Sequence, residues 1–148
     1  MRWIARAALA ALPALAAVPA LAADPPRYVA GPASGYQYDC QQARQPVPKL
    51  ATLVTEIPDL DGDGLPEHVI DSGKGCAANQ LLYCNDAEGC TISVWLSSWS
   101  GIAERFKARS WTAATGAMTV TTGGEACGGA AECTLTYRWT GERLLPVP

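Results

Sequence analysis

The residues with the clearest chemical potential are four acids on alternate positions of one short loop. The run from Asp59 to Glu67 reads Asp-Leu-Asp-Gly-Asp-Gly-Leu-Pro-Glu, with carboxylates at its positions 1, 3, 5 and 9. Alternate side chains of a tightly curled loop turn toward one centre, and Ca²⁺ takes six or more oxygens at about 2.3 to 2.6 Å. The sequence therefore predicts one structural calcium ion, held by Asp59, Asp61, Asp63, Glu67 and the backbone carbonyl of Leu65.

The residues around this loop distinguish it from an EF-hand. An EF-hand places a bidentate acid at position 12, where this chain has Ile70. The flanking residues 53–57 and 68–70 read as strands rather than helices. The loop instead resembles the calcium-binding hairpins of FG-GAP and VCBS-type extracellular β-proteins, whose motif is Asp-x-Asp-x-Asp-Gly-x-x-Asp, with Glu67 in place of the last Asp. The resemblance is confined to this hairpin, residues 59–67, and implies a loop geometry and a cation.

The cysteines indicate an oxidising compartment. All six follow residue 22, and an even number in an exported chain favours disulfide bonds over metal binding. Two pairs each enclose a short loop of Gly, Ala and acids between strand-like runs, which is typical of a cross-link at the mouth of a hairpin. The favoured pairs, with other pairings left open, are Cys84 with Cys90, Cys127 with Cys133 and Cys40 with Cys76. An acidic loop followed by closely spaced cysteines is similar to small exported bacterial proteins whose function is mostly unassigned.

The start of the chain predicts export. Residues 1–22 have a basic beginning, an Ala- and Leu-rich stretch and a terminal Ala-Leu-Ala, as in a secretory signal. Prolines interrupt the apolar stretch and no second one follows it, which argues against a membrane anchor. A periplasmic or secreted protein is therefore expected. Residues 23–48, rich in Pro and Gly, are expected to form an irregular arm, and residues 49–148 a single β domain.

Short runs of Val, Ile, Thr, Tyr and Trp between Gly and Asp turn signals determine the predicted fold class. It is mainly β: a single antiparallel meander that forms a small sandwich or barrel, cross-linked by disulfides. Alternation is clearest in residues 91–99, where Ile92, Val94 and Leu96 occupy one face. The expected strands are residues 52–57, 67–71, 81–84, 91–98, 103–109, 118–122, 133–140 and 143–146.

The opposite face of residues 91–99 carries the candidate binding surface, Trp95 and Trp99. Exposed tryptophans anchor sugars and protein partners, whereas buried ones would pack under a second sheet or the arm. Nucleic acid is not an expected partner, because the net charge is −3 and the basic residues are scattered. Their only local cluster, Arg105, Lys107 and Arg109, is expected to be the solvated face of a strand.

These features favour a non-enzymatic function. The chain has a single histidine, His68, which disfavours catalytic sites built on histidine. We expect an exported calcium-binding module that binds a protein or glycan in the cell envelope. The alternative is a periplasmic inhibitor or accessory protein that presents the loop 84–90 or 127–133 to a target enzyme, similar in size and rigidity to small exported lysozyme inhibitors. A carboxylate-based hydrolase is the least favoured reading.

Overall fold

The structure, a computed structural model, describes residues 24–147, and the signal sequence expected for residues 1–22 lies outside that range. Most of the described chain is arranged as short strands joined by tight turns. The helices are α1 (Arg27–Gln42), α2 (Leu50–Leu53), η1 (Ser72–Lys74), α3 (Ala77–Tyr83) and η2 (Gly124–Cys127). The strands are β1 (Val54–Ile57), β2 (Glu67–Asp71), β3 (Cys84–Asn85), β4 (Gly89–Leu96), β5 (Gly101–Ala108), β6 (Ser110–Ala114), β7 (Ala117–Thr122), β8 (Cys133–Trp139) and β9 (Leu144–Val147).

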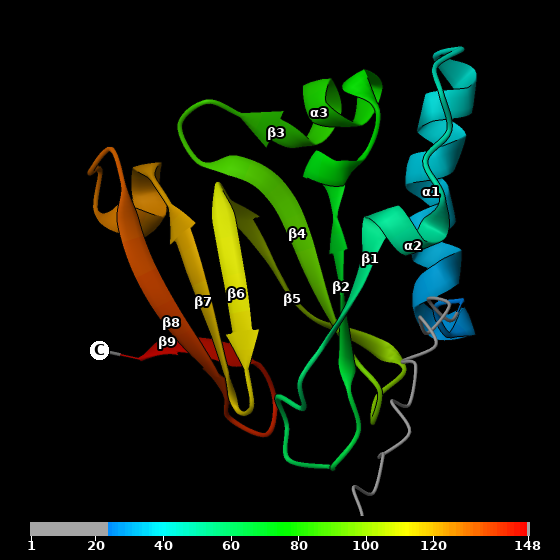
Figure 1. Cartoon of the computed structure of the whole chain (residues 1–148). Coiled ribbons are helices and arrows are strands. Elements are labelled where there is room, and N and C mark those ends of the chain that lie inside the picture. Colours follow the sequence, from blue (N-terminus) through cyan, green and yellow to red (C-terminus); the bar gives the residue numbers. More distant parts are fainter. Residues whose placement is uncertain (1–23, 148) are drawn as a thin grey trace, which may run out of the picture.

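Two antiparallel sheets form the body of the protein, so the predicted mainly-β class is confirmed. In the first sheet the order is β1-β2-β4-β3, with β5 paired to β4, and in the second it is β6-β7-β8-β9. Figure 1 shows the second sheet on one side of the first and helices α1 and α2 on the other. Among the described strands none pairs across the two sheets, and the chain passes from the first sheet to the second at Arg109. The arrangement is therefore a sandwich, and the barrel alternative is wrong.

The core follows the alternation read from β4. Ile92, Val94 and Leu96 are buried between the two sheets, where they meet Met118 and Val120 of β7. The opposite face of the first sheet is covered by α1. A second apolar cluster lies there, made of Val29, Ala33, Leu53, Val54 and Ile70. Both faces of the first sheet are thus shielded from water, which stabilises a domain of this size through apolar burial.

The irregular arm expected for residues 23–48 is wrong, because most of this segment forms helix α1. The Pro- and Gly-rich composition argued against a helix, and Pro32 indeed lies inside it. Val29, Ala33 and Cys40 are nonetheless buried on one face of the helix, at spacings of four and seven residues. Packing of this face on the first sheet, together with the bond from Cys40 to Cys76, outweighs the unfavourable local propensity.

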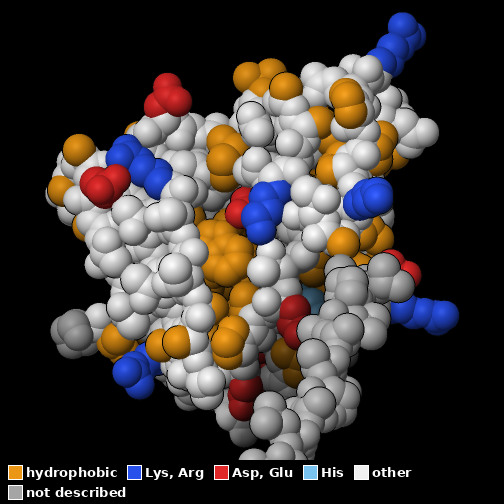
Figure 2. Space-filling view, in the orientation of Figure 1, with side chains coloured by type: hydrophobic (Ala, Val, Ile, Leu, Met, Phe, Trp, Pro, Cys, Tyr) orange, Lys and Arg blue, Asp and Glu red, His pale blue; other side chains and the backbone are white. Residues whose placement is uncertain are grey.

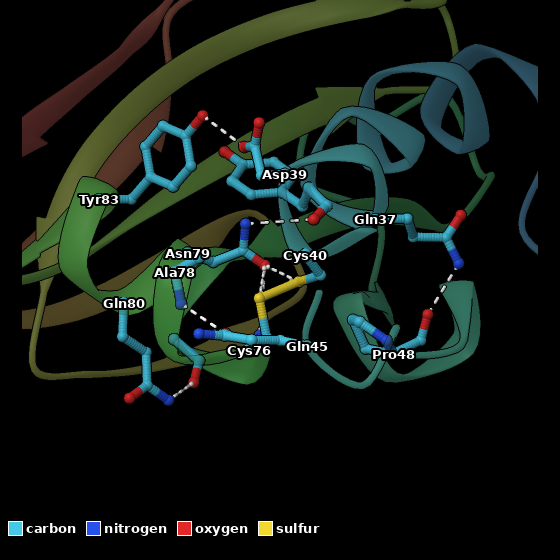
Figure 3. The surroundings of a disulfide bond; sticks show 12 residues. Gln37, Asp39, Cys40, Gln45, Pro48, Cys76, Ala78, Asn79, Gln80 and Tyr83 are labelled. Atoms are coloured by element: carbon cyan, nitrogen blue, oxygen red, sulfur yellow. Dashed lines mark hydrogen bonds between the residues drawn. A yellow bond between two sulfur atoms is a disulfide. The ribbon is translucent and has the colours of Figure 1, made fainter. Parts of the chain in front are cut away.

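The strand expected over residues 81–84 is also wrong, because residues 81–83 belong to helix α3. Asn79 is fully buried and its side chain accepts a hydrogen bond from Cys76 N (3.3 Å) and donates one to Tyr36 O (3.1 Å). Figure 3 shows this amide between the two chain segments. The amide fixes the first turn of α3 against α1. Leu81 and Leu82 then point outward and are exposed, although their apolar character is typical of a buried strand.

The three disulfides have the pairing that the loop context favoured: Cys40 with Cys76, Cys84 with Cys90 and Cys127 with Cys133. The first joins α1 to the N-terminus of α3, and each of the others closes a loop beside a strand (Figure 3 shows the first). Three bridges in a domain this small are typical of an oxidising compartment. None of the helices in residues 24–147 is both long and apolar enough to cross a membrane.

Candidate metal centre

The four predicted acids lie together at one end of the sandwich, in the loop between β1 and β2. Asp59, Asp61, Asp63 and Glu67 each offer a carboxylate oxygen, and these oxygens all lie within 4.8 Å of one another. Strand pairing brings the two ends of the loop together, because Ile57 of β1 stands opposite Glu67 of β2. The cluster could hold a metal ion and is consistent with a loop of the Asp-x-Asp-x-Asp type.

Asp59 organises the loop backbone. Its two carboxylate oxygens accept hydrogen bonds from Gly62 N (2.7 Å) and Gly64 N (2.9 Å). These bonds hold the pKa of Asp59 below its usual range. Both glycines adopt positive φ angles, 88° and 85°, which disfavour residues with a side chain. The curled shape that turns alternate side chains inward is therefore built into the sequence.

The next two acids repeat this pattern over shorter spans. Asp61 accepts a hydrogen bond from Asp63 N (3.1 Å), and Asp63 accepts one from Leu65 N (2.7 Å). Each carboxylate uses one oxygen on the loop backbone and keeps the other free for a different contact. The side chain of Leu65 is exposed, and the role of its carbonyl as a ligand stays a prediction.

Glu67 is the most constrained of the four acids. Its side chain is fully buried, and it accepts hydrogen bonds from the backbone N–H of Ser97 (2.5 Å) and from the Ser97 hydroxyl (3.3 Å). Burial, followed by the nearby carboxylates of Asp61 and Asp63, raises its pKa to about 7, although the Ser97 N–H bond opposes this rise. A buried negative charge among like charges is destabilising unless a cation compensates it.

No basic side chain supplies that compensation within residues 24–147. The two ion pairs there join His68 to Glu56 and Arg109 to Glu132, and neither includes one of the four acids. A divalent cation at the centre of the cluster would neutralise the carboxylates directly. The donor set of the site, crowded oxygens with one buried carboxylate and no basic partner in the described part of the chain, therefore fits a bound metal ion.

Ser97 and Ser98, which the sequence did not point to, form the opposite wall of the site. The Ser97 hydroxyl lies 3.2 Å from Asp63 Oδ2, and the Ser98 hydroxyl donates to Asp61 Oδ2 (2.5 Å). Pairing of His68 with Trp95 brings the end of β4 beside the start of β2. Two serines in a turn do not by themselves indicate a metal site. Their place beside the acids follows only from the register in which β2 and β4 pair.

The site also contacts the second sheet. The backbone N–H of Gly116, in the turn between β6 and β7, donates to the carbonyl of Asp59 (2.8 Å). Gly116 has a φ of 73°, as a tight turn at this point requires. The acidic loop therefore contacts segments from both sheets. A fixed conformation of this loop helps to hold the neighbouring turns at this end of the sandwich in place.

The two candidate binding tryptophans do not share a face, which corrects that expectation. Trp95 packs against the apolar cluster under α1, and its buried indole Nε1 has no hydrogen-bond partner among the described residues. Strand β4 ends at Leu96, so the alternation stops before Trp99. Trp99 lies in the following turn, is 52% exposed and packs edge-on against Trp139 at 4.9 Å between ring centroids. The only exposed tryptophan of the pair thus adjoins the acidic loop.

The raised pKa of Glu67 predicts an unusual pH dependence of the metal-free protein. The folded pKa of about 7 exceeds the ordinary value of 4.5, so this group's stabilisation is complete below pH 4.5 and is lost as pH rises through 7. Urea denaturation in chelator should therefore show a Glu67 contribution that falls between pH 5 and pH 8, and excess calcium should remove that fall.

His68 contributes with the opposite sign, because burial lowers its pKa below 6.5. The contribution of His68 to the free energy of unfolding is the same in chelator and in calcium. The difference in unfolding free energy between the two conditions therefore reports on Glu67. Stability curves that run parallel from pH 5 to pH 8, with and without calcium, would contradict the assigned burial of an uncompensated carboxylate.

Comparison with known proteins gives no further guide to this site. The chain matches no protein-family model, and no curated protein or solved structure shows significant similarity to it. The function therefore has to be inferred from the acidic cluster, the disulfides and the surface of the molecule.

Proposed function

We propose that this chain is an exported calcium-binding β module that binds a protein or glycan partner in the cell envelope and is not an enzyme. The observation that carries the proposal is the buried carboxylate of Glu67 inside a cluster of four acids that has no basic partner among residues 24–147. Three disulfides add support for export, since such bonds form and persist outside the cytosol.

Calcium suits the cluster better than other common cations. Its donors are oxygens, whereas zinc sites are built mainly from Cys and His. Magnesium requires near-ideal octahedral geometry and usually keeps several of its waters. Calcium accepts six to eight oxygens in flexible geometry, which suits carboxylates on a curled loop and the carbonyl of Leu65. The role proposed for the ion is structural.

The ion would act on the surface that carries Trp99. The hydroxyls of Ser97 and Ser98 contact the carboxylates, and Trp99 follows them directly in the same turn. Neutralising the carboxylates would hold this turn in place and present the Trp99–Trp139 pair in a fixed orientation. Exposed, rigid aromatic pairs are effective anchors for a partner, so we place the partner contact there.

The absence of catalytic activity is part of the proposal, and the environment of His68 supports it. This histidine is 6% exposed, and its Nδ1 is hydrogen-bonded to the hydroxyl of Tyr28 (2.8 Å). It belongs to the contact between α1 and the first sheet. A histidine in that position is poorly placed to exchange protons with a bound substrate.

Thermal melting in calcium and in chelator tests the proposal. A ligand that binds only the folded state stabilises it, by about 2.7 kcal/mol at 100 times its Kd. The melting temperature should therefore rise with calcium in the native protein and in the matched control Asp86→Ala, an exposed acid distant from the loop. Asp61→Ala should show little or no rise. Equal rises in all three proteins, or none at millimolar calcium (about 5 mM) in the native protein, would count against the site.

A second candidate, an inhibitor or accessory protein, is favoured by the joining of two disulfide loops. Arg109 donates to the carbonyls of Asp86 (3.1 Å) and Ala87 (2.8 Å) in one loop and pairs with Glu132 (3.1 Å) in the other. A Cβ at Gly123 would lie 2.3 Å from Ala87 O, so the loops leave no room for a side chain there. Loops 84–90 and 127–133 thus form one rigid surface, at the end of the sandwich away from the acidic loop (Figure 1).

An inhibition assay tests this second candidate. A lysozyme assayed on cell walls should be slowed by the protein, and Arg109→Leu should weaken the inhibition about tenfold or more, because it releases the two preorganised loops. Arg138→Leu, an exposed arginine on β8, is the matched control and should inhibit as the native protein does. Full lysozyme activity at a large excess of the native protein would exclude this enzyme class as the target.

A further inference from the structure

A groove between the two sheets combines an aromatic wall with charged side chains. It has a volume of about 570 Å³ and is lined by residues that include Asp71, Lys74, Ser110 and Trp111. Figure 2 shows hydrophobic side chains at the floor of a hollow near the centre of this face, with a basic and an acidic side chain at its edge. The groove is formed where the end of β2 faces the start of β6, so it is separate from the acidic loop.

Asp71 fixes the aromatic wall of this groove. One of its carboxylate oxygens accepts a hydrogen bond from Trp111 Nε1 (3.1 Å), and the other accepts one from Gly73 N (2.9 Å). Trp111 belongs to the second sheet and Asp71 to the first, so the bond holds the indole across the opening. Each carboxylate oxygen has a further lone pair, so Asp71 can also accept a hydrogen bond from a ligand hydroxyl.

Lys74 brings a positive charge to the same place. Its ammonium donates to the Thr55 hydroxyl (2.8 Å) and lies 5.7 Å from the centroid of the Trp111 ring. Neither ion pair in residues 24–147 includes Lys74. Arg109, which also lines the groove, is already bound to the two disulfide loops. Lys74 is therefore the cation that an anionic ligand in the groove would meet.

We propose that this groove binds an acidic saccharide unit. A sugar ring has an apolar C–H face, which packs against the Trp111 indole, and hydroxyls, which donate to the spare lone pairs of Asp71. A carboxylate on the sugar pairs with the exposed Lys74 ammonium at the edge of the groove in a charge-assisted hydrogen bond. The assignment specifies the glycan option of the proposed function and rests on it; it does not depend on calcium binding.

The test is an NMR titration of the folded, calcium-supplied protein that follows the indole N–H signal of Trp111. The variant Trp111→Phe identifies this signal by its loss. Trigalacturonate, added to about 10 mM, is the acidic probe, and maltotriose is the neutral probe of equal length. We expect a saturable shift with trigalacturonate and none with maltotriose at the same concentration.

Lysine variants decide whether the charge is responsible. Lys74→Gln should weaken trigalacturonate binding about tenfold or more, as the loss of a charged hydrogen bond does. Lys49→Gln, an exposed lysine outside the groove, should bind as the native protein does. Binding unchanged in Lys74→Gln, equal shifts with both sugars, or no shift with trigalacturonate would overturn the proposal. Because calcium-dependent melting is measured separately, failure here is distinguishable from failure of the calcium site.

Discussion

The burial of the Glu67 carboxylate is the constraint on which one whole end of this protein depends. Three other carboxylates surround it, and their oxygens lie within 4.8 Å of each other. A negative charge without contact with water is tolerated only when it is neutralised or strongly hydrogen-bonded. The Ser97 bonds supply part of this, and the proposed calcium ion would supply the rest. In the proposed function, calcium binding and the folding of this end are therefore one process in physical terms.

The sheets and disulfides give that site a fixed frame. Pairing of β1 with β2 closes the acidic loop, and pairing of β2 with β4 places Ser97 against Glu67. The disulfides act elsewhere, on α1, α3 and the loops at the far end. Disulfides thus cross-link one end of the sandwich, and the proposed metal ion would stabilise the opposite end. The groove at Trp111 lies between them, at the junction of the two sheets.

The features that sequence could predict are those set by local chemistry. The acidic loop was predictable because alternate acids with glycines at positive φ define a shape within a few residues. The pairing of Cys84 with Cys90 was predictable for the same reason. Helix α1 was not, since burial of Val29 and Ala33 against a distant strand overrides a composition that disfavours helices. Ser97 and the separation of Trp95 from Trp99 depend on strand register and strand length, which the sequence left open.

The central claim is that Glu67 carries a buried charge whose compensation is calcium. Its most direct test is the melting temperature of Glu67→Gln at pH 8, above the folded pKa of about 7, measured in chelator and in calcium. In chelator the variant should melt at a higher temperature than the native protein, because it buries no charge. In calcium this order should reverse, because the variant has lost a carboxylate ligand. A variant that melts below the native protein in chelator, and gains as much as the native protein from calcium, would contradict the claim.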